Sequence, residues 1–137
     1  MAARTVANCL GGVCDPERTQ GLKSPAPKGS NLVVDLKGPG VFVGAEVVKQ
    51  GGSSNLTFVD LEIDGRNVVS ISFAAADNFG LTQYNPFGLV LLKPSAAMKN
   101  LTIGFPSPLR YKRRLTLTVN VNETGVAQIL ANVVHGS

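Results

Sequence analysis

The clearest pattern in the chain is a strict alternation of apolar and polar side chains over residues 115–122. Leu115, Leu117, Val119 and Val121 alternate there with threonine and asparagine. Successive side chains of a strand point to opposite faces, so these four would share one face. The pattern predicts a strand with one face in a core and the other in water or at an interface.

A second alternation covers residues 57–64. It places Thr57, Val59, Leu61 and Ile63 on one face and the acids Asp60, Glu62 and Asp64 on the other. Gly65 follows Asp64, and this pair tolerates positive φ in a tight turn. We therefore predict a hairpin over residues 55–73, with its acids directed to solvent.

Short β-rich runs separated by turn residues continue along most of the chain. We count about eight candidate strands, at residues 31–37, 41–49, 55–64, 67–73, 87–92, 98–103, 111–121 and 126–134. No segment has a long helical stripe, and residues 95–99 could form one helical turn at most. The spacing predicts an all-β fold, a single jelly-roll-like antiparallel β-sandwich.

Residues 1–30 have a different character. Gly11, Gly12, Pro16, Pro25 and Pro27 interrupt this segment, and it has no regular apolar period. Such a segment cannot bury enough apolar surface to offset its ordering entropy. We therefore expect an irregular N-terminal arm over residues 1–30, which is mobile or lies on a partner, followed by a sandwich domain over residues 31–137.

The length and composition of the chain are typical of a domain with one hydrophobic core. The chain has 137 residues, of which 44% are hydrophobic and 16% charged, and its formal net charge is +4. The densest cationic cluster comprises Arg110, Lys112, Arg113 and Arg114, beside Tyr111. It could meet phosphates or an acidic partner, but cations at the start of a strand also protect sheets against edge-to-edge pairing, and we favour that interpretation.

Chemistry-bearing residues are few. Cys9 and Cys14 form a C-x4-C pair without further ligands, which is too little for a zinc site, and either a disulfide or two free thiols would fit. The only histidine, His135, lies at the far end of the sequence, where we expect fraying. We predict no metal, no cofactor and no enzymatic activity. No apolar run has the length of a signal peptide or a membrane span.

One loop stands out for its length and its aromatic content. Residues 78–88 carry no charge and include Phe79, Gln83, Tyr84 and Phe87. Long loops in compact domains often carry function. We expect Phe79 and Phe87 to plug the end of the sandwich and Gln83 and Tyr84 to lie on the surface.

Two stretches carry a resemblance to a known class of protein. Residues 61–80, LEIDGRNVVSISFAAADNFG, and residues 106–119, PSPLRYKRRLTLTV, resemble the strand, turn and loop pattern of viral-type jelly rolls. Capsid and spike proteins and one glycoside hydrolase family share that fold. Those hydrolases require a pair of carboxylates that flank a sugar, and no such pair can be assigned here. The resemblance implies a jelly roll of the viral type and, by analogy, a virion protein.

Two hypotheses of function follow. The first is a structural virion protein of a tailed phage, a capsid decoration (cement) or minor capsid subunit, assembled in the host cytoplasm. It would bind itself, as a trimer or larger oligomer, and the major capsid protein, and we expect it to bind neither membrane nor nucleic acid. The alternative is a module that binds a carbohydrate or a receptor through the 78–88 loop. Candidate interaction residues are Arg4, Cys9, Cys14, Arg18, Lys23, Gln83, Tyr84, Arg110, Tyr111 and Lys112.

Overall fold

The computed structural model describes residues 13–86 and 88–137, so the expectations for Arg4, Cys9 and Phe87 fall outside the described residues. The described elements are β1 (Glu17–Lys23), β2 (Gly29–Lys37), β3 (Gly40–Gly51), β4 (Thr57–Ile63), β5 (Arg66–Ser72), α2 (Phe73–Asn78), β6 (Leu89–Leu92), β7 (Met98–Ile103), β8 (Leu109–Tyr111), β9 (Arg114–Val121) and β10 (Val126–Gly136). Strands dominate, as the alternating patterns predict.

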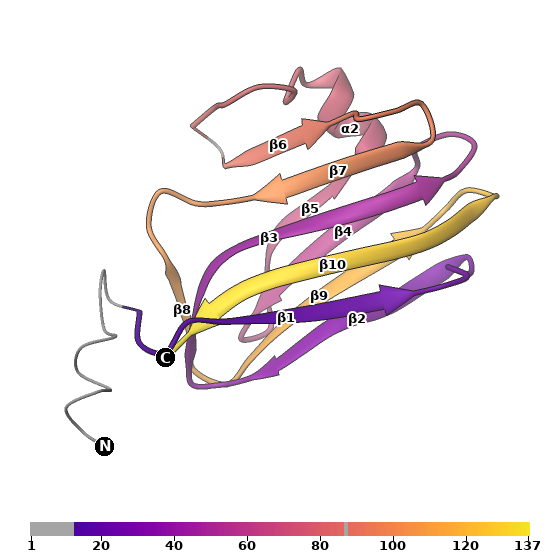
Figure 1. Cartoon of the computed structure of the whole chain (residues 1–137). Coiled ribbons are helices and arrows are strands. Elements are labelled where there is room, and N and C mark those ends of the chain that lie inside the picture. Colours follow the sequence, from indigo (N-terminus) through magenta and orange to yellow (C-terminus); the bar gives the residue numbers. More distant parts are fainter. Residues whose placement is uncertain (1–12, 87) are drawn as a thin grey trace.

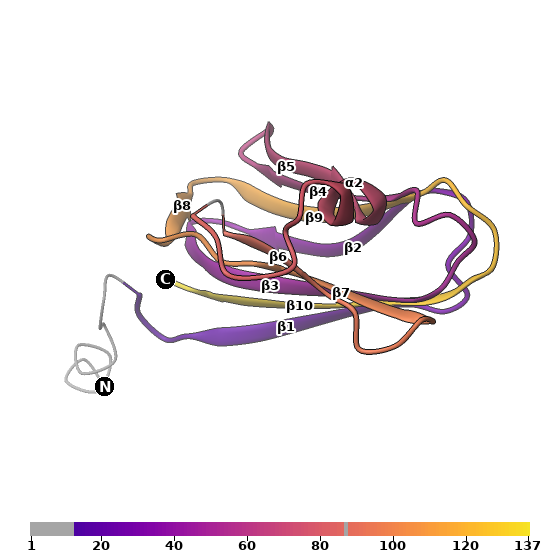
Figure 2. The same cartoon turned by 90° about the horizontal axis from the view of Figure 1, so that it is seen from above.

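The strands form two antiparallel sheets that face each other (Figure 1, Figure 2). The first sheet has the order β1-β10-β3-β7-β6, with β8 paired to β3, and the second has the order β2-β9-β4-β5. The chain crosses from one sheet to the other between most consecutive strands. This connectivity, in which β1 pairs with β10 and β2 with β9, confirms the predicted jelly-roll-like sandwich.

The core lies between the sheets and uses the predicted alternations. All four apolar side chains of β9, residues 115, 117, 119 and 121, are buried, and so are the four inward residues of β4. From the first sheet, Val47, Leu101, Ile103, Ile129 and Val133 meet them. A sandwich core of this kind needs one apolar face per sheet, and the period of two along each strand supplies it.

Part of the predicted arm belongs to the sandwich, which corrects the expected domain boundary. Glu17–Lys23 forms β1 and pairs with β10 along its whole length. The sequence missed it because its edge position buries few side chains and because Gly21 stands at its centre. A Cβ at Gly21 would lie 2.2 Å from the carbonyl oxygen of Val33, so glycine lets β1 approach β2 closely.

The strand predicted over residues 111–121 is two strands in different sheets. β8 pairs with β3 of the first sheet, whereas β9 lies at the centre of the second. The turn between them is held by the carboxylate of Asp64, which accepts hydrogen bonds from the backbone N–H groups of Lys112, Arg113 and Arg114 at 2.7–3.0 Å. Asp64 and Gly65 both have positive φ in the β4–β5 turn, as predicted.

The helical expectations were misplaced. Residues 95–97 contain no helix, and β7 begins at Met98, whereas the short helix α2 follows β5 directly. Ser72 caps α2, because its Oγ accepts a hydrogen bond from the N–H of Ala75 at 2.9 Å. The sequence does contain a signal for this helix: a serine, which is a good N-cap residue, shortly before three alanines, which are good helix formers.

Asp64 generates a prediction about acid stability. The three backbone hydrogen bonds lower the pKa of its carboxyl from 3.8 to about 2. The group therefore stabilises the fold above its unfolded pKa of 3.8, and this contribution disappears as the pH falls through about 2. We expect Asp64→Asn to lower the melting temperature at neutral pH, with a gap to the wild type that closes between pH 4 and pH 2.

Asp60→Asn removes the same charge from the same hairpin and is the matched control. Its melting curve should follow that of the wild type more closely at neutral pH, because Asp60 does not hold the β8–β9 turn. A gap for Asp64→Asn that stays constant down to pH 2 would contradict the assignment.

Candidate functional site

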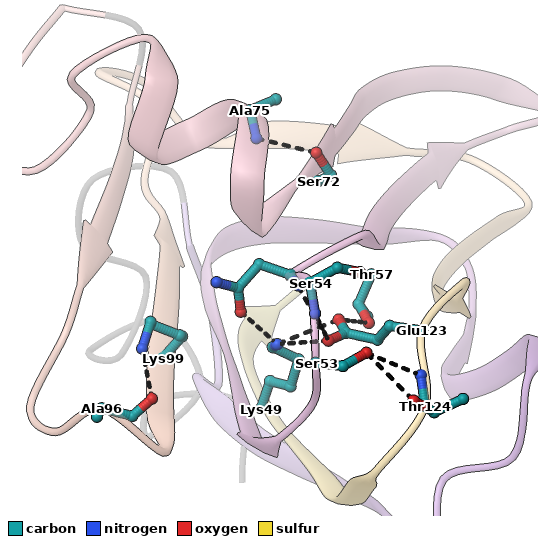
Figure 3. A network of polar contacts seen from close by, with 11 residues as sticks. Lys49, Ser53, Ser54, Thr57, Ser72, Ala75, Ala96, Lys99, Glu123 and Thr124 are labelled. Atoms are coloured by element: carbon teal, nitrogen blue, oxygen red, sulfur yellow. Dashed lines mark hydrogen bonds and ion pairs between the residues drawn. The ribbon is translucent and has the colours of Figure 1, made fainter.

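The described part of the chain contains one extensively bonded polar cluster inside the sandwich end (Figure 3). Lys49, on β3, and Glu123, in the turn between β9 and β10, form an ion pair at 3.1 Å with both side chains fully buried. Lys49 Nζ also donates to Asn55 Oδ1 at 2.6 Å and lies 5.4 Å from the centroid of the Phe73 ring. Burying two charges is costly unless each has partners on several sides, and both have them here.

The carboxylate of Glu123 is saturated with donors. Besides Lys49, it accepts hydrogen bonds from the hydroxyl of Thr57 and from the backbone N–H groups of Ser54 and Asn55. Burial alone would raise the pKa of Glu123, but these hydrogen bonds outweigh it and hold that pKa below its ordinary value. Glu123 is therefore a buried carboxylate that stays ionised.

The cluster is suited to a structural task rather than to acid–base chemistry. A general acid or base must reach the proton that it transfers, and both charged side chains are sealed from solvent. The partners of Glu123 lie on β3, in the β3–β4 connection and at the start of β4. Further hydrogen bonds join this connection to the β9–β10 turn: Gly52 N–H to Gly125 O, and Thr124 to Ser53 Oγ. The sequence contains one signal that our predictions did not use. Lys49 follows Ala45 and Val47 at a spacing of two residues, so the alternation places its side chain inside the sandwich.

His135 is not frayed, which corrects the expectation from its position in the sequence. It lies in β10, opposite Glu17 of β1, and is buried. Its Nε2 is 2.7 Å from Thr19 Oγ1, and its Nδ1 is 3.9 Å from a carboxylate oxygen of Glu17. These contacts fasten β1 to β10.

Only part of the basic cluster is available to a binding partner. Arg110, Lys112, Arg113 and Arg114 are all exposed, but Arg114 also makes a two-pronged contact with Asp35 at 2.7–2.8 Å. Tyr111 is buried in the core, so the structure removes it from the candidate interaction residues. The backbone amides beneath this cluster are occupied by Asp64 and are not open to an external anion.

In the loop after α2, the side chain of Phe79 does not plug the end of the sandwich. Phe79 is 75% exposed, which contradicts its predicted place in the core, whereas Tyr84, at 93%, and Gln83 are exposed as predicted. Tyr84 borders a cavity of about 320 Å³ whose other lining residues include Val90, Ile103 and Phe105. This is a mostly apolar hollow at the β6–β7 edge.

The side chains of Asn85 and Thr102, which line this hollow, already bond to backbone oxygens. Asn85 Nδ2 donates to the carbonyl oxygens of Leu89 and Gln83, and Thr102 Oγ1 donates to Val90 O at 3.2 Å. A carbohydrate site needs free polar groups that converge on the ligand. The hollow therefore fits an apolar side chain of a protein better than a sugar.

The described candidate residues near the N-terminus, Cys14, Arg18 and Lys23, lie on or beside β1. Arg18 is exposed and Lys23 is half-buried at the other end of the strand. Cys14 is disulfide-bonded, which answers the open question for that residue. Its backbone exchanges two hydrogen bonds with Ser137, at 2.6 and 2.7 Å. The chain is thus fixed to the end of β10 from residue 14 onwards.

Two other findings concern the described residues only. Residues 13–86 and 88–137 contain no group of three or more His, Cys, Asp or Glu side chains that could hold a metal ion. No helix in this part of the chain is long and apolar enough to cross a membrane.

The buried pair yields a prediction about stability. We expect Lys49→Met and Glu123→Gln each to cost about 3–5 kcal/mol of unfolding free energy, because each leaves a buried charge without its counterion. The double variant should lose clearly less than the sum of the two. Urea denaturation of all four proteins measures this coupling.

The exposed pair Lys93–Asp77, at 2.9 Å, is the matched control. Its coupling, from Lys93→Met and Asp77→Asn, should stay within about 1 kcal/mol. Additive losses at Lys49 and Glu123 would show that the two charges do not stabilise each other.

Comparison with known proteins identifies the fold. No family model and no curated protein sequence matches the chain. Among solved structures, a chain from the acidic stable capsid structure of Helicobacter pylori bacteriophage KHP30 matches 89% of this chain and 87% of its own length, with 11% identity and a TM-score of 0.54. A chain of the cyanophage Pam1 capsid asymmetric unit matches 89% of this chain and 84% of its own length, with 11% identity and a TM-score of 0.50. The protein therefore shares its fold with chains found in bacteriophage capsids.

Proposed function

We propose that the protein is a structural component of a bacteriophage virion, either a capsid decoration (cement) subunit or a minor capsid subunit. The observation that carries the proposal is the fold likeness to chains from two phage capsids over nearly the whole length of each. The buried polar cluster is consistent with it, because Lys49 and Glu123 stabilise the sandwich and are closed to any substrate.

The subunit would bind its neighbours through the surface of the sandwich and through the segment that precedes β1. Residues 1–12 carry the cation Arg4 and no acid, and they lead into β1 beside Arg18. Two linked contacts with neighbouring subunits would add avidity, since the second contact forms within an existing complex. The major capsid protein and other copies of this chain are the partners we propose.

The carbohydrate-binding alternative has less support. Tyr84 is exposed beside a hollow, as a sugar-binding aromatic would be, but the polar groups of Asn85 and Thr102 are bonded to backbone oxygens. A glycosidase has less support still: Asp64 is held by three backbone amides and Glu123 is sealed, so neither can serve in a pair of catalytic carboxylates.

Quantitative mass spectrometry of purified particles of the virus that encodes this chain tests the proposal. We expect many copies of the chain per particle, at a fixed ratio to the major capsid protein. A variant without residues 1–12 keeps every described strand and is the informative comparison. It should fold and yet be incorporated less. Particles that are complete and infectious without any copy of the chain would refute the proposal.

A further inference from the structure

The outer faces of the two sheets differ in chemistry. On the second sheet, β2-β9-β4-β5, the outward positions are rich in charge and include Asp35, Asp60, Glu62 and Arg114 among threonines and asparagines. Antiparallel sheets with one face in water show this composition. Among the outward positions of β1, β10, β3, β7 and β6, only Arg18 and Glu46 are charged.

An apolar row crosses the first sheet from one edge to the other. The registers place Leu22 of β1 beside Leu130 of β10, and Leu130 beside Val48 of β3. Asn100 of β7 comes next, followed by Leu92 of β6. Leu22 is 58% exposed and Leu92 46%, while Leu130 and Val48 are half-buried by their neighbours. We name this outer surface, together with Met98, Val134 and the neighbouring row described next, the apolar sheet face.

Three polar residues, Asn100 of this row and Asn132 and Glu46 of the neighbouring row, bond to each other. Glu46 accepts hydrogen bonds from Asn132 Nδ2 at 2.9 Å and from Asn100 Nδ2 at 3.3 Å. A carboxylate can only accept, so both amides must turn their nitrogens towards it. This leaves Oδ1 of Asn100 and Asn132 covered and without a partner. These three polar side chains of the face are therefore held by each other, which suits an interface better than a wet surface.

We propose that a second copy of this chain docks on the apolar sheet face, so that two sandwiches pack sheet against sheet. The inference deepens the proposed function, on which it rests for its biological setting, by naming the surface through which copies associate. The five strands offer a flat area of roughly 650 Å² at about 3.4 Å per residue and about 4.8 Å per strand. Stable interfaces bury about 800 Å² of accessible surface per partner, which a corrugated face of this size supplies.

Charge also favours a copy of this chain as the occupant. The net charge of +4 makes two copies repel each other over most approaches, but the two outward charges of this face are opposite and cancel. Arg18 and Glu46 border one shallow hollow of about 300 Å³, with Val134 beside them. In a twofold contact residue i meets j and j meets i, so Arg18 of each copy can pair with the partner's Glu46.

Light scattering of the full chain on a sizing column, over a wide range of concentrations, tests this inference. We expect the wild type to form dimers or larger even-numbered assemblies. Leu22→Glu combined with Leu92→Glu should raise the dissociation constant at least about tenfold, because both side chains become charged within the contact. Leu32→Glu is the matched control: Leu32 is 45% exposed on the outer face of the second sheet, and this variant should associate like the wild type.

A second variant separates association from folding. Arg18→Glu changes an exposed side chain of an edge strand and would face the partner's Glu46 with a like charge, so it should also dissociate the protein. Arg18→Lys should not. A wild type that stays monomeric at every concentration, or equal dissociation by Leu32→Glu, would overturn the inference.

Particle composition keeps the two proposals distinct. A monomeric wild type that is nevertheless incorporated into particles would overturn the docking surface and leave the virion role intact. A wild type that dimerises through this face and is absent from complete particles would support the surface and overturn the virion role.

Discussion

The end of the sandwich depends on the buried ion pair between Lys49 and Glu123. Both connections that meet there, β3–β4 and β9–β10, cross from one sheet to the other. Glu123 bonds to Lys49 of β3, to Ser54 in the first connection and to Thr57 of β4. Two buried charges are stable only where the ion pair has good geometry and the other donors and acceptors of both side chains have hydrogen-bond partners. The pair therefore fixes how the loops close, and with it the separation of the two sheets at this end.

The two strands that Glu123 joins, β9 and β10, each lie between two other strands of their sheet. β9 pairs with β2 and β4, β10 pairs with β1 and β3, and Glu123 sits in the turn that joins β9 to β10. At the other end, Asp64 holds the β8–β9 turn by a similar principle, with a carboxylate that gathers backbone N–H groups. Apolar side chains fill the space between these two polar anchors. The virion role that we propose would use the outside of the sandwich.

Sequence reasoning found the fold because most strands bury one face and expose the other. The alternations of β4 and β9 predicted which of their side chains lie between the two sheets, and Asp64-Gly65 predicted the turn of the β4–β5 hairpin. It missed β1, whose stability comes from backbone pairing and from the close approach at Gly21 rather than from an apolar pattern. It also placed Phe79 inside and counted Tyr111, which is buried, among the candidate interaction residues, because an aromatic residue in a loop or beside cations carries no periodic signal. Asn132, Glu46 and Asn100 come together only through strand register, which requires the folded sheet.

If a second copy docks as we propose, one outer face of the sandwich meets that copy and the other meets water. Hydroxyl-radical footprinting of the full chain, read by mass spectrometry in dilute and in concentrated solution, tests this division side chain by side chain. We predict that Leu22, Leu92 and Met98 become protected as concentration rises, while Leu32 and Val68 of the second sheet are labelled equally throughout. Unchanged labelling of Leu22, Leu92 and Met98, or protection of Leu32 and Val68 instead, would contradict the account.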